Sequence, residues 1–488
     1  HNFDAMAGYE WQHFHREGNN RYTGYYPKTN TINPGKEYSP SHKEWASENF
    51  LVSFFGRLNY TLAGKYLFTA TVRRDGSSRF HKDHRWGTFP SFAFGWKMKE
   101  EGFLKDIDAL SDLKLRLGYG VTGQQNIGSD YSYFASYTAN KGFAYYPIGY
   151  GKGESYRPDA YNKNLKWEKT TTSNAGLDFG LMNGRISGAV DYYYRRTDDL
   201  INYVYVSAGT NFKNQVNANI GSLENRGVEF SIQAKPVVQK DFTWDIGFNL
   251  TYNKNKITKL TSGDGEGYYV STGGISYGTG NKVQAHAVGH PAYAFYVYQQ
   301  VYDEKGKPIE NTFVDRNGDG IINESDKYFY KKPTADVLMG LSSKMLYKAW
   351  DFSFTLRTSL NNYVYNDVES SSSNLSQLYA PSGFLINRPT MTLANNWQGE
   401  GNFYMSDYFV QNASFLKCDN ITLGYSFNLK RLGSGRVFAA VQNVFTITGY
   451  KGLDPELITG SGTGLNYGID RDLYPRPFTS LMGVTLNF

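Results

Sequence analysis

Cysteine is nearly absent from this sequence of 488 residues, which contains only Cys418. A single thiol excludes disulfide bonds within the chain and any metal centre built on several thiolates. The sequence also has no run of about 18 apolar residues, which excludes a membrane-spanning helix. Because the formal net charge is only +6 and the basic residues form no concentrated stripe, nucleic acid is a poor candidate for a partner.

Aromatic residues are abundant, at 17% of the chain, with 41 Tyr and 32 Phe, while the mean hydropathy of -0.54 is that of a hydrophilic protein. This combination suggests surfaces that are half apolar and half polar, as in extensive β-sheet. The first residues, HNFDAMAGYEWQ, have the pattern of the middle of a strand rather than that of a signal peptide. We therefore expect the chain to begin inside a longer protein.

Apolar and polar residues alternate with a period of two in many segments. Residues 242–252 (FTWDIGFNLTY), 350–360 (WDFSFTLRTSL) and 112–121 (DLKLRLGYGV) are the clearest cases. Because successive side chains of a strand point to opposite faces, each segment has one apolar and one polar face. The polar faces carry side chains such as Asp245, Asn249 and Arg357.

The links between these segments fall into two classes. Asn183-Gly184 predicts a tight hairpin turn, because both residues tolerate positive φ, and similar short links occur at residues 62–65, 347–351 and 429–435. The alternation predicts about fourteen strands, most of about 9–13 residues, with short and long links in strict alternation. The long links fall near residues 15–48, 76–86, 122–167, 200–223, 258–334, 362–412 and 448–474.

This pattern is typical of a bacterial outer-membrane β-barrel, with short turns on one side and long extracellular loops on the other. In lipid, only helices and closed barrels satisfy every backbone hydrogen bond. A soluble all-β sandwich is the alternative. The final stretch, SLMGVTLNF, places Met482, Val484, Leu486 and Phe488 on one face, and outer-membrane barrels commonly end in such a strand, with a terminal aromatic as the barrel-assembly signal. We therefore predict an all-β, antiparallel transmembrane barrel.

An ordered series of short stretches resembles one family over essentially the whole chain. The series includes RRDGSSRF (73–80), RWGTFPSFAFGW (85–96), DLKLRLGYGVTGQQNIG (112–128), NLKWEKTTTSNAGLDFGL (164–181), ASFLKCDNITLGYSF (413–427) and YGIDRDLYPRPFTSLMGVTLNF (467–488). Together they resemble the C-terminal barrel half of the SusC/RagA-type TonB-dependent transporters of Bacteroidetes. One departure is Lys417-Cys418-Asp419, where that family more often has an Arg-Leu-Lys-like run.

The resemblance implies that residues 1–488 form the C-terminal portion of an outer-membrane barrel, about 14 of a probable 22 strands, with the plug domain and N-terminal strands absent from this chain. It implies active import of a nutrient, most often an oligosaccharide and sometimes a peptide, rather than enzymatic activity. The implied partners are a SusD-like surface lipoprotein, the TonB complex acting through the plug, and outer-membrane lipid. A passive porin, a barrel-anchored adhesin and a secreted glycan-active enzyme are the alternatives.

The predicted extracellular link 258–334 contains DRNGDGIINESD at 315–326, which resembles an EF-hand calcium loop. Position 12 is an Asp rather than a Glu, and the flanking sequence does not predict the two helices that a calcium sensor needs. A structural calcium staple and a turn that needs no metal both remain possible. Oxygen ligands would come from loop positions 1, 3, 5, 7, 9 and 12, which are Asp315, Asn317, Asp319, Ile321 (through its carbonyl), Asn323 and Asp326.

Aromatic residues in the long links are candidate substrate contacts, since sugar rings stack on aromatic faces. We single out Tyr145, Tyr146 and Tyr269; the alternative is that they pack the links together or touch the partner lipoprotein.

Two histidine pairs have spacings that zinc could use, namely His13 with His15 and His81 with His84. The sequence shows no further ligand set beside them, so we interpret all four as polar residues at the rim of the barrel. The G-x-G-x-x-G match at residues 118–123 is not followed by a helix, which a dinucleotide site requires. We expect no cofactor beyond a possible structural calcium ion.

Overall fold

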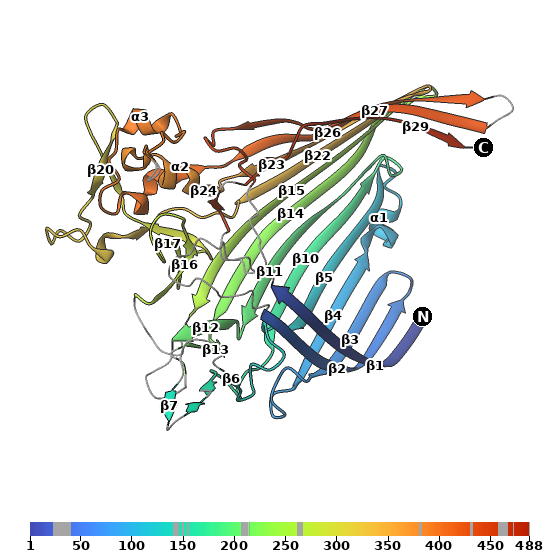
Figure 1. Cartoon of the computed structure of the whole chain (residues 1–488). Helices are drawn as coiled ribbons and strands as arrows, with labels where there is room; N and C mark the ends of the chain where they lie inside the picture. Colours follow the sequence, from blue (N-terminus) through green and yellow to red (C-terminus); the bar gives the residue numbers. More distant parts are fainter. Residues whose placement is uncertain are drawn as a thin grey trace. The chain divides into compact units, whose positions relative to one another are not determined.

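The computed structural model of the chain (Figure 1) is dominated by β-strands, as the alternation predicts. No helix within the described residues has the length and apolar character needed to cross a membrane. The structure describes residues 1–22, 41–139, 146–148, 151–153, 156–205, 213, 215–260, 267–379, 383–429, 433–456, 467–471 and 473–487.

Fourteen strands form one sheet whose order follows the chain, and neighbouring pairs such as β1–β2 and β22–β23 are antiparallel. This agrees with the strand number predicted from the alternation. The strands are β1 (Asn2–Tyr22), β2 (Ser41–Leu62), β3 (Tyr66–Ser77), β4 (Trp86–Lys97), β5 (Leu110–Gln124), β10 (Glu168–Leu181), β11 (Ile186–Asp198), β14 (Ser222–Val238), β15 (Phe242–Lys259), β22 (Val337–Tyr347), β23 (Trp350–Leu360), β26 (Phe415–Leu429), β27 (Gly433–Thr448) and β29 (Thr479–Asn487).

The strand lengths correct one expectation. β1 and β2 have 21 and 22 residues, and β14 and β15 have 17 and 18, well above the predicted range. The ladder hydrogen bonds continue into segments such as Asn253–Lys259, where the apolar face has ended. The length of a strand therefore exceeds the length of its apolar stripe.

The register aligns the apolar residues of neighbouring strands on one face. Phe248 of β15 lies opposite Ile232 of β14 and Leu341 of β22, and Leu341 in turn lies opposite Leu356 of β23. The rings of Trp350 and Tyr425 pack against each other near the short turns, with centroids 4.8 Å apart and an angle of 53° between the planes, as expected for an aromatic girdle. A slip by one residue would turn every side chain of a strand to the other face, so this match fixes the register.

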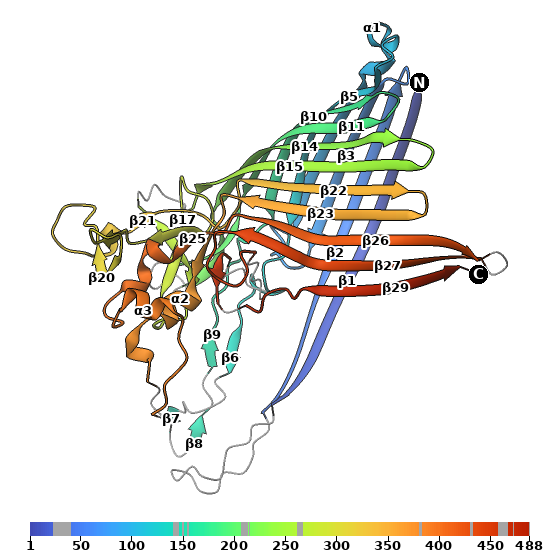
Figure 2. The same cartoon turned by 90° about the horizontal axis from the view of Figure 1, so that it is seen from above.

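Short and long links leave opposite ends of the strands, as Figure 2 shows for β22, β23, β26 and β27. The turn before β11 has positive φ at Met182, Asn183 and Gly184, which confirms the predicted hairpin. Strict alternation of link length is wrong at one place: the link between β4 and β5 covers residues 98–109, more than residues 78–85 between β3 and β4. Two short helices occupy it, and the Lys99 ammonium donates to three of its carbonyls.

The chain divides into two compact units. One comprises residues 1–94, 118–172 and 197–221, and the other residues 95–117, 173–196 and 222–488. In the first unit, Trp167 packs with Phe80 and Phe89 in a small core. A Cβ on Gly123 would lie 2.1 Å from the ring of Phe89. The glycine of the G-x-G-x-x-G match therefore provides room for a ring, and β5 continues through it to Gln124.

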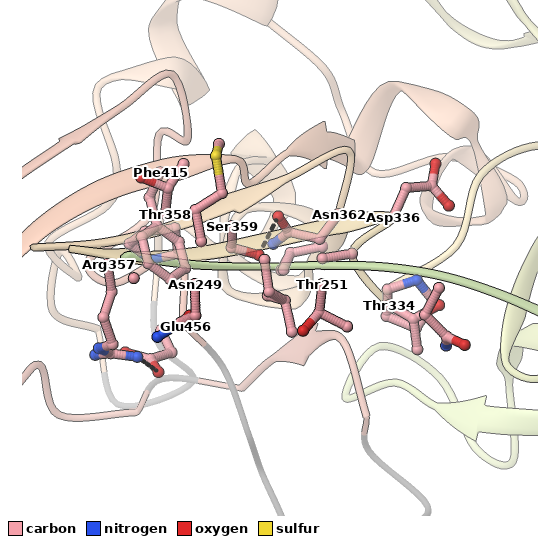
Figure 3. Close-up of a pocket in the computed structure, with 18 of the residues that line it drawn as sticks. Asn249, Thr251, Thr334, Asp336, Arg357, Thr358, Ser359, Asn362, Phe415 and Glu456 are labelled. Carbon is pink, nitrogen blue, oxygen red and sulfur yellow. Dashed lines mark hydrogen bonds and ion pairs between the residues drawn. The ribbon is translucent and has the colours of Figure 1, made fainter. Parts of the chain in front are cut away.

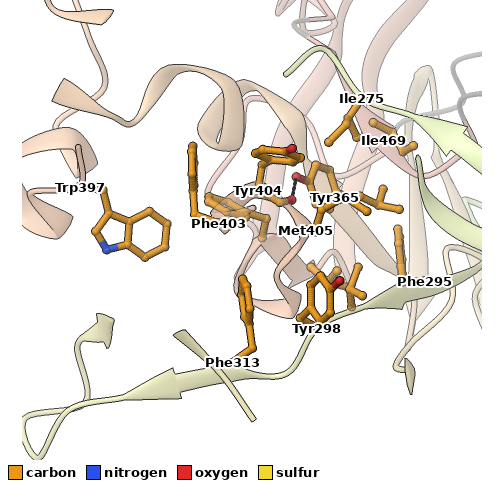
Figure 4. Close-up of a cluster of buried hydrophobic side chains, with 14 residues drawn as sticks. Ile275, Phe295, Tyr298, Phe313, Tyr365, Trp397, Phe403, Tyr404, Met405 and Ile469 are labelled. Atoms are coloured by element: carbon orange, nitrogen blue, oxygen red, sulfur yellow. Dashed lines mark hydrogen bonds between the residues drawn. The ribbon is translucent and has the colours of Figure 1, made fainter. Parts of the chain in front are cut away.

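In the second unit the long links have a hydrophobic core of their own (Figure 4). It combines residues from three links, such as Phe295, Tyr365 and Ile469, all fully buried. Tyr365 also donates its hydroxyl to the Tyr404 carbonyl. Because aromatic pairs add to the burial of apolar area, these links have the character of a packed domain.

Short strands and helical turns make up the links. The strands are β6 (Tyr137–Ala139), β7 (Tyr146–Ile148), β8 (Gly151–Gly153), β9 (Tyr156–Pro158), β12 (Ile201–Tyr205), β13 (Gln215–Asn219), β16 (Tyr269–Gly274), β17 (Lys282–Ala287), β18 (Ala294–Val297), β19 (Gln300–Tyr302), β20 (Pro308–Phe313), β21 (Tyr328–Phe329), β24 (Tyr363–Asn366), β25 (Val410–Asn412) and β28 (Ile469–Asp470). The helices are α1 (Gly102–Lys105), α2 (Asp367–Ser372) and α3 (Met391–Asn395), with 3-10 turns η1 (Met98–Glu100), η2 (Glu324–Asp326), η3 (Leu375–Gln377), η4 (Phe403–Met405) and η5 (Asp407–Phe409).

Candidate functional site

A cavity of about 650 Å³ lies against the polar face of β15, β22 and β23 (Figure 3). Its walls combine amides, hydroxyls and ionised groups with substantial apolar surface, from side chains such as Leu338, Val364 and Phe415. This composition suits an uncharged ligand with both polar and apolar surface. The polar lining residues are Asn249, Thr251, Asn253, Thr334, Asp336, Ser342, Thr355, Arg357, Thr358, Ser359, Asn362, Glu456 and Tyr467.

The strand register brings the first of these side chains together. Asn249 lies opposite Gly340, Gly340 opposite Arg357, and Arg357 opposite Lys417. A Cβ on Gly340 would lie 2.9 Å from the Asn249 amide. The glycine therefore leaves room for a polar row that runs across four strands.

Arg357 is held by two carboxylates. Its guanidinium donates to both oxygens of Glu456, at 2.8 and 3.1 Å, and to both oxygens of Asp419. Such two-point contacts fix the plane of the guanidinium as well as its position. The guanidinium of Arg357 is therefore already held in one position at the cavity wall before any ligand binds.

Glu456 is the centre of this charge network. It also accepts from the Lys417 ammonium at 3.1 Å and lies 3.3 Å from the Arg476 guanidinium. Burial by itself would raise the pKa of the Glu456 carboxyl, but the hydrogen bonds from Arg357 and Lys417 outweigh it and lower the pKa to about 2. The Glu456 carboxyl is therefore ionised at neutral pH. Its contacts with Arg357 of β23 and Lys417 of β26 connect the link that follows β27 to the sheet.

A β-bulge in β26 makes this network possible. Thr355 lies opposite Asn420 and Leu356 opposite Cys418, so Asp419 is the extra residue. A bulge re-aims side chains and shifts the phase of the strand. As a result Lys417 and Asp419 join the polar face with Arg357, although the Lys-Cys-Asp run is where the sequence departs from the family pattern.

At the far end of β23, side-chain hydrogen bonds close the strand. The Ser359 hydroxyl donates to the Asn362 amide oxygen at 2.9 Å, and the Asn362 amide donates to the Ala413 carbonyl at 2.9 Å. Both side chains are buried. This connection orders the wall of the cavity where the strand passes into the long link.

The predicted aromatic contacts are not brought to the cavity by the described structure. Tyr269 starts β16, where its ring packs on Tyr296 with centroids 4.8 Å apart. Tyr146 belongs to β7, of whose side chains nothing is described, and Tyr145 lies outside the described residues. The C-terminal Phe488 is also outside them. The aromatic lining of the cavity includes Tyr467 and Phe415 instead.

Two of the three polar-face residues named from the sequence line the cavity. Asn249 and Arg357 line the cavity as polar-face residues, whereas Asp245 lies farther along β15, 3.9 Å from the Lys235 ammonium. Asp419 and Glu456 were missed because they are 62 and 99 residues from Arg357 in sequence. The signal that could have revealed the bulge is the phase change of the alternation between Lys417 and Ile421.

The calcium-like loop is closed by its own hydrogen bonds. The two carboxylate oxygens of Asp315 accept from the backbone N–H groups of Gly318 and Gly320 at 2.7 and 2.8 Å. Asp326, fully buried, accepts from the backbone N–H groups of Arg316 and Asn323 at 2.8 and 2.9 Å. These bonds connect the two ends of the loop.

The flanks of this loop are strands, since β20 ends at Phe313 and β21 begins at Tyr328. The other members of the predicted set make local contacts: the Asn317 and Asn323 amide oxygens accept from the backbone N–H groups of Asp319 and Ser325. Ile321 donates its own N–H to the Asp319 carboxylate at 2.8 Å.

Comparison with known proteins places the chain in a family. The family model described as "TonB dependent receptor-like, beta-barrel" matches residues 1–444. The TonB-dependent receptor SusC of Bacteroides thetaiotaomicron is 58% identical over 100% of this chain and 48% of its own length. The TonB-dependent receptor P39 of Formosa agariphila is 34% identical over 94% of this chain and 48% of its own length.

Among solved structures, the RagAB peptide transporter superposes with a TM-score of 0.78 over 100% of this chain and 53% of that chain, at 24% identity. The chain spans about half the length of the curated relatives it matches. These matches confirm the resemblance to the SusC/RagA type and the barrel fold. The chain belongs to the TonB-dependent receptor family, whose β-barrels reside in the outer membrane.

Proposed function

We propose that the protein to which this chain belongs imports an oligosaccharide across the outer membrane, driven by the TonB complex and together with a SusD-like surface lipoprotein. The observation that carries the proposal is the cavity on the polar face of β15, β22 and β23, in a chain of this family. Its role is binding and passage rather than bond-making.

The chemistry of the cavity favours a hydroxyl-rich ligand. Asn249, Thr251 and Thr355 offer donors and acceptors on one polar face, and sugar hydroxyls need both kinds of partner. The positive charge of the Arg357 guanidinium is compensated by the carboxylates of Asp419 and Glu456, so the ligand does not need to supply a negative charge. A neutral substrate therefore suits this wall better than an anionic one.

Peptide import is the second candidate, because a solved relative of the same fold is described as a peptide transporter. The cavity also offers apolar surface from Leu338, Phe415 and Val364, which peptide side chains would use. A passive porin or a barrel-anchored adhesin finds less support, since the matched relatives are TonB-dependent receptors.

A surface for the lipoprotein is available on the long links. Tyr379 and Leu385 form a β-bridge, and these residues together with Phe384 and Leu393 are between 66% and 81% exposed. Exposed apolar patches commonly mark interaction sites. Energy coupling would act through the plug, which lies in the part of the relatives that this chain does not span.

The test is uptake by cells that carry the full-length transporter and its lipoprotein. Fluorescently labelled neutral oligosaccharides and labelled peptides are compared, with and without a functional TonB system. We expect TonB-dependent uptake of the oligosaccharides, reduced about tenfold by Asn249→Ala combined with Thr251→Ala if one or two hydrogen bonds to substrate are lost.

Thr243→Ala is the matched control, because Thr243 lies on the same strand and the same face but outside the cavity. Selective uptake of peptides would overturn the substrate class. Uptake that does not depend on TonB would favour the porin.

A further inference from the structure

We propose that His13, His15 and Glu48 form a zinc-binding site on the outer face of the β1–β2 pair. Each residue offers one ligand atom, and these atoms all lie within 4.8 Å of one another. The site consists of side chains from adjacent strands in one unit of the molecule, and it shares no residue with the cavity. The proposal therefore does not rest on the substrate of the transporter.

The strand geometry creates the cluster. His13 and His15 are two residues apart on β1, so they point to the same face. Glu48 of β2 lies directly opposite His15 in the register, and its carboxylate reaches diagonally to His13, with His13 Nε2 and Glu48 Oε2 3.3 Å apart. This third ligand is remote in sequence, because β2 returns only after the long link that follows β1.

The donor set suits zinc. Two imidazoles and one carboxylate are the protein ligands of many open zinc sites, in which water takes the fourth position. Ligand bonds of about 2.0–2.2 Å place two donors of one ion about 3–4 Å apart. His13 Nε2 and Glu48 Oε2, 3.3 Å apart, are within this span. The other ligand atoms lie within 4.8 Å of one another, and the side chains of His13, His15 and Glu48 are exposed enough to adjust.

One ligand is already oriented. The ring of Phe50 stacks on the ring of His13, with centroids 4.4 Å apart and an angle of 7° between the planes. This contact restricts the rotation of the imidazole, so less side-chain entropy is lost when an ion binds. A second carboxylate, that of Glu17, lies 3.5 Å from His15 Nε2 and is available to replace the bound water.

The position indicates what the ion would do. Phe3, Tyr9 and Trp11, between 56% and 64% exposed, share the odd-numbered face of β1 with the two histidines. The ion would therefore sit at the end of an apolar outer stripe, on the opposite face from the Arg73–Glu10 ion pair. Bridging β1 and β2 there, it would cross-link the two strands within their ladder, seven residue pairs before the last pair, Tyr22 with Ser41.

The alternative is an ordinary ion pair between Glu48 and a protonated histidine, with no metal. To distinguish the two, the full-length transporter is purified in detergent with a histidine-free affinity tag, stripped with EDTA, and titrated with ZnCl₂ by calorimetry. We expect one saturable site per chain. Each of His13→Ala and His15→Ala weakens zinc binding by more than about tenfold, since even outer-shell partners of a metal are worth about 10–100-fold.

The double variant His81→Ala with His84→Ala is the matched control, because it removes a second pair of closely spaced histidines elsewhere. Glu48→Gln keeps the side-chain shape and is expected to weaken binding as well. Absence of saturable binding by the wild type, or an equal loss in the control, overturns the proposal.

A second readout counts the coordinated nitrogens directly. Cu²⁺ is bound by imidazole sites at least as strongly as zinc, and the electron paramagnetic resonance spectrum of the wild type loaded with one Cu²⁺ reports the number of coordinated nitrogens. Two equivalent imidazoles are expected, and one in the variant that lacks His15. A spectrum without nitrogen coupling, or with coupling that persists unchanged in both single variants, contradicts the site.

Discussion

Glu456 gives the sharpest prediction for a single residue. Its pKa is about 2 in the folded chain against an ordinary value of 4.5, so its contribution to stability is full above about pH 4.5 and is lost as the pH falls toward 2. The contribution is on the order of 3 kcal/mol at most. Thermal unfolding of the detergent-solubilised protein at pH about 7, 4.5 and 3 measures it.

Glu456→Gln is the comparison, since it replaces the titrating carboxyl group by an uncharged amide of nearly the same shape. We expect the variant to be less stable than the wild type at neutral pH, and the difference to shrink as the pH falls. A difference that stays constant down to pH about 3 would show that the Arg357 network does not depend on this charge.

Asp326 provides a second test at this scale. Hydrogen bonds from the backbone, that of Asn323 first, lower the pKa of its carboxyl against the opposing effect of burial. We expect the loop 315–326 to remain closed in EDTA, with slow amide hydrogen exchange at Arg316 and Asn323, and to exchange at least about tenfold faster in Asp326→Ala.

Calcium binding to this loop remains our proposal, and calorimetry with CaCl₂ tests it. Asp315→Ala combined with Asp319→Ala is expected to abolish the heat of binding, because both carboxylates lie at ligand positions of the calcium-like loop. Identical titrations of this double variant and the wild type would leave the loop as a turn held by hydrogen bonds alone.

At the level of elements, the bulge at Asp419 sets the phase of β26. Lys417 faces the polar side, and Ile421 and Leu423 face the apolar side, because Asp419 is inserted between them. Deleting Asp419 would turn one half of the strand over. We expect the deletion to abolish assembly, seen as loss of heat-modifiable migration in gels and of recovery from the outer-membrane fraction.

Asp419→Ala is the matched control. It keeps the extra residue and removes only the carboxylate that binds Arg357, so assembly should persist with a modest loss of stability, about 1–3 kcal/mol. Normal assembly of the deletion variant would mean that the register of β26 is fixed elsewhere.

The alternation predicts the strands and their faces because each is a local property of the chain, repeated every two residues. The hairpin at Asn183-Gly184 is equally local. Strand ends and side-chain partners are not local properties of the sequence. Ladder hydrogen bonds extend past the apolar stripe, and Glu456 reaches Arg357 from another link. From the sequence, the site could therefore be predicted only as a row of polar side chains on one face of the strands. The charge network around Arg357 is visible only in the structure.

At the scale of the whole molecule, the long links are the part least visible in the sequence. Their aromatic residues, such as Phe403 and Trp397, are buried against one another, whereas the sequence favoured aromatic residues in links as substrate contacts. A packed core needs apolar side chains wherever the chain folds back on itself, and the composition of a link does not reveal which of its rings are buried. The apolar residues that stay exposed are then the better candidates for binding a partner.

Leu393 and Phe384, in the link between β23 and β26, are 81% and 72% exposed, and we expect them to contact the proposed SusD-like surface lipoprotein. Leu393→Ser together with Phe384→Ser should lower the amount of lipoprotein that co-purifies with the full-length transporter by at least about tenfold, because each buried side chain of this size is worth about 1.5–3 kcal/mol. Ile321→Ser is the control, since Ile321 is 65% exposed on the calcium-like loop. The barrel itself should assemble normally in both variants, because all three residues lie in links and not in the strands of the large sheet. Unchanged recovery of the lipoprotein would place its contact on other parts of the links.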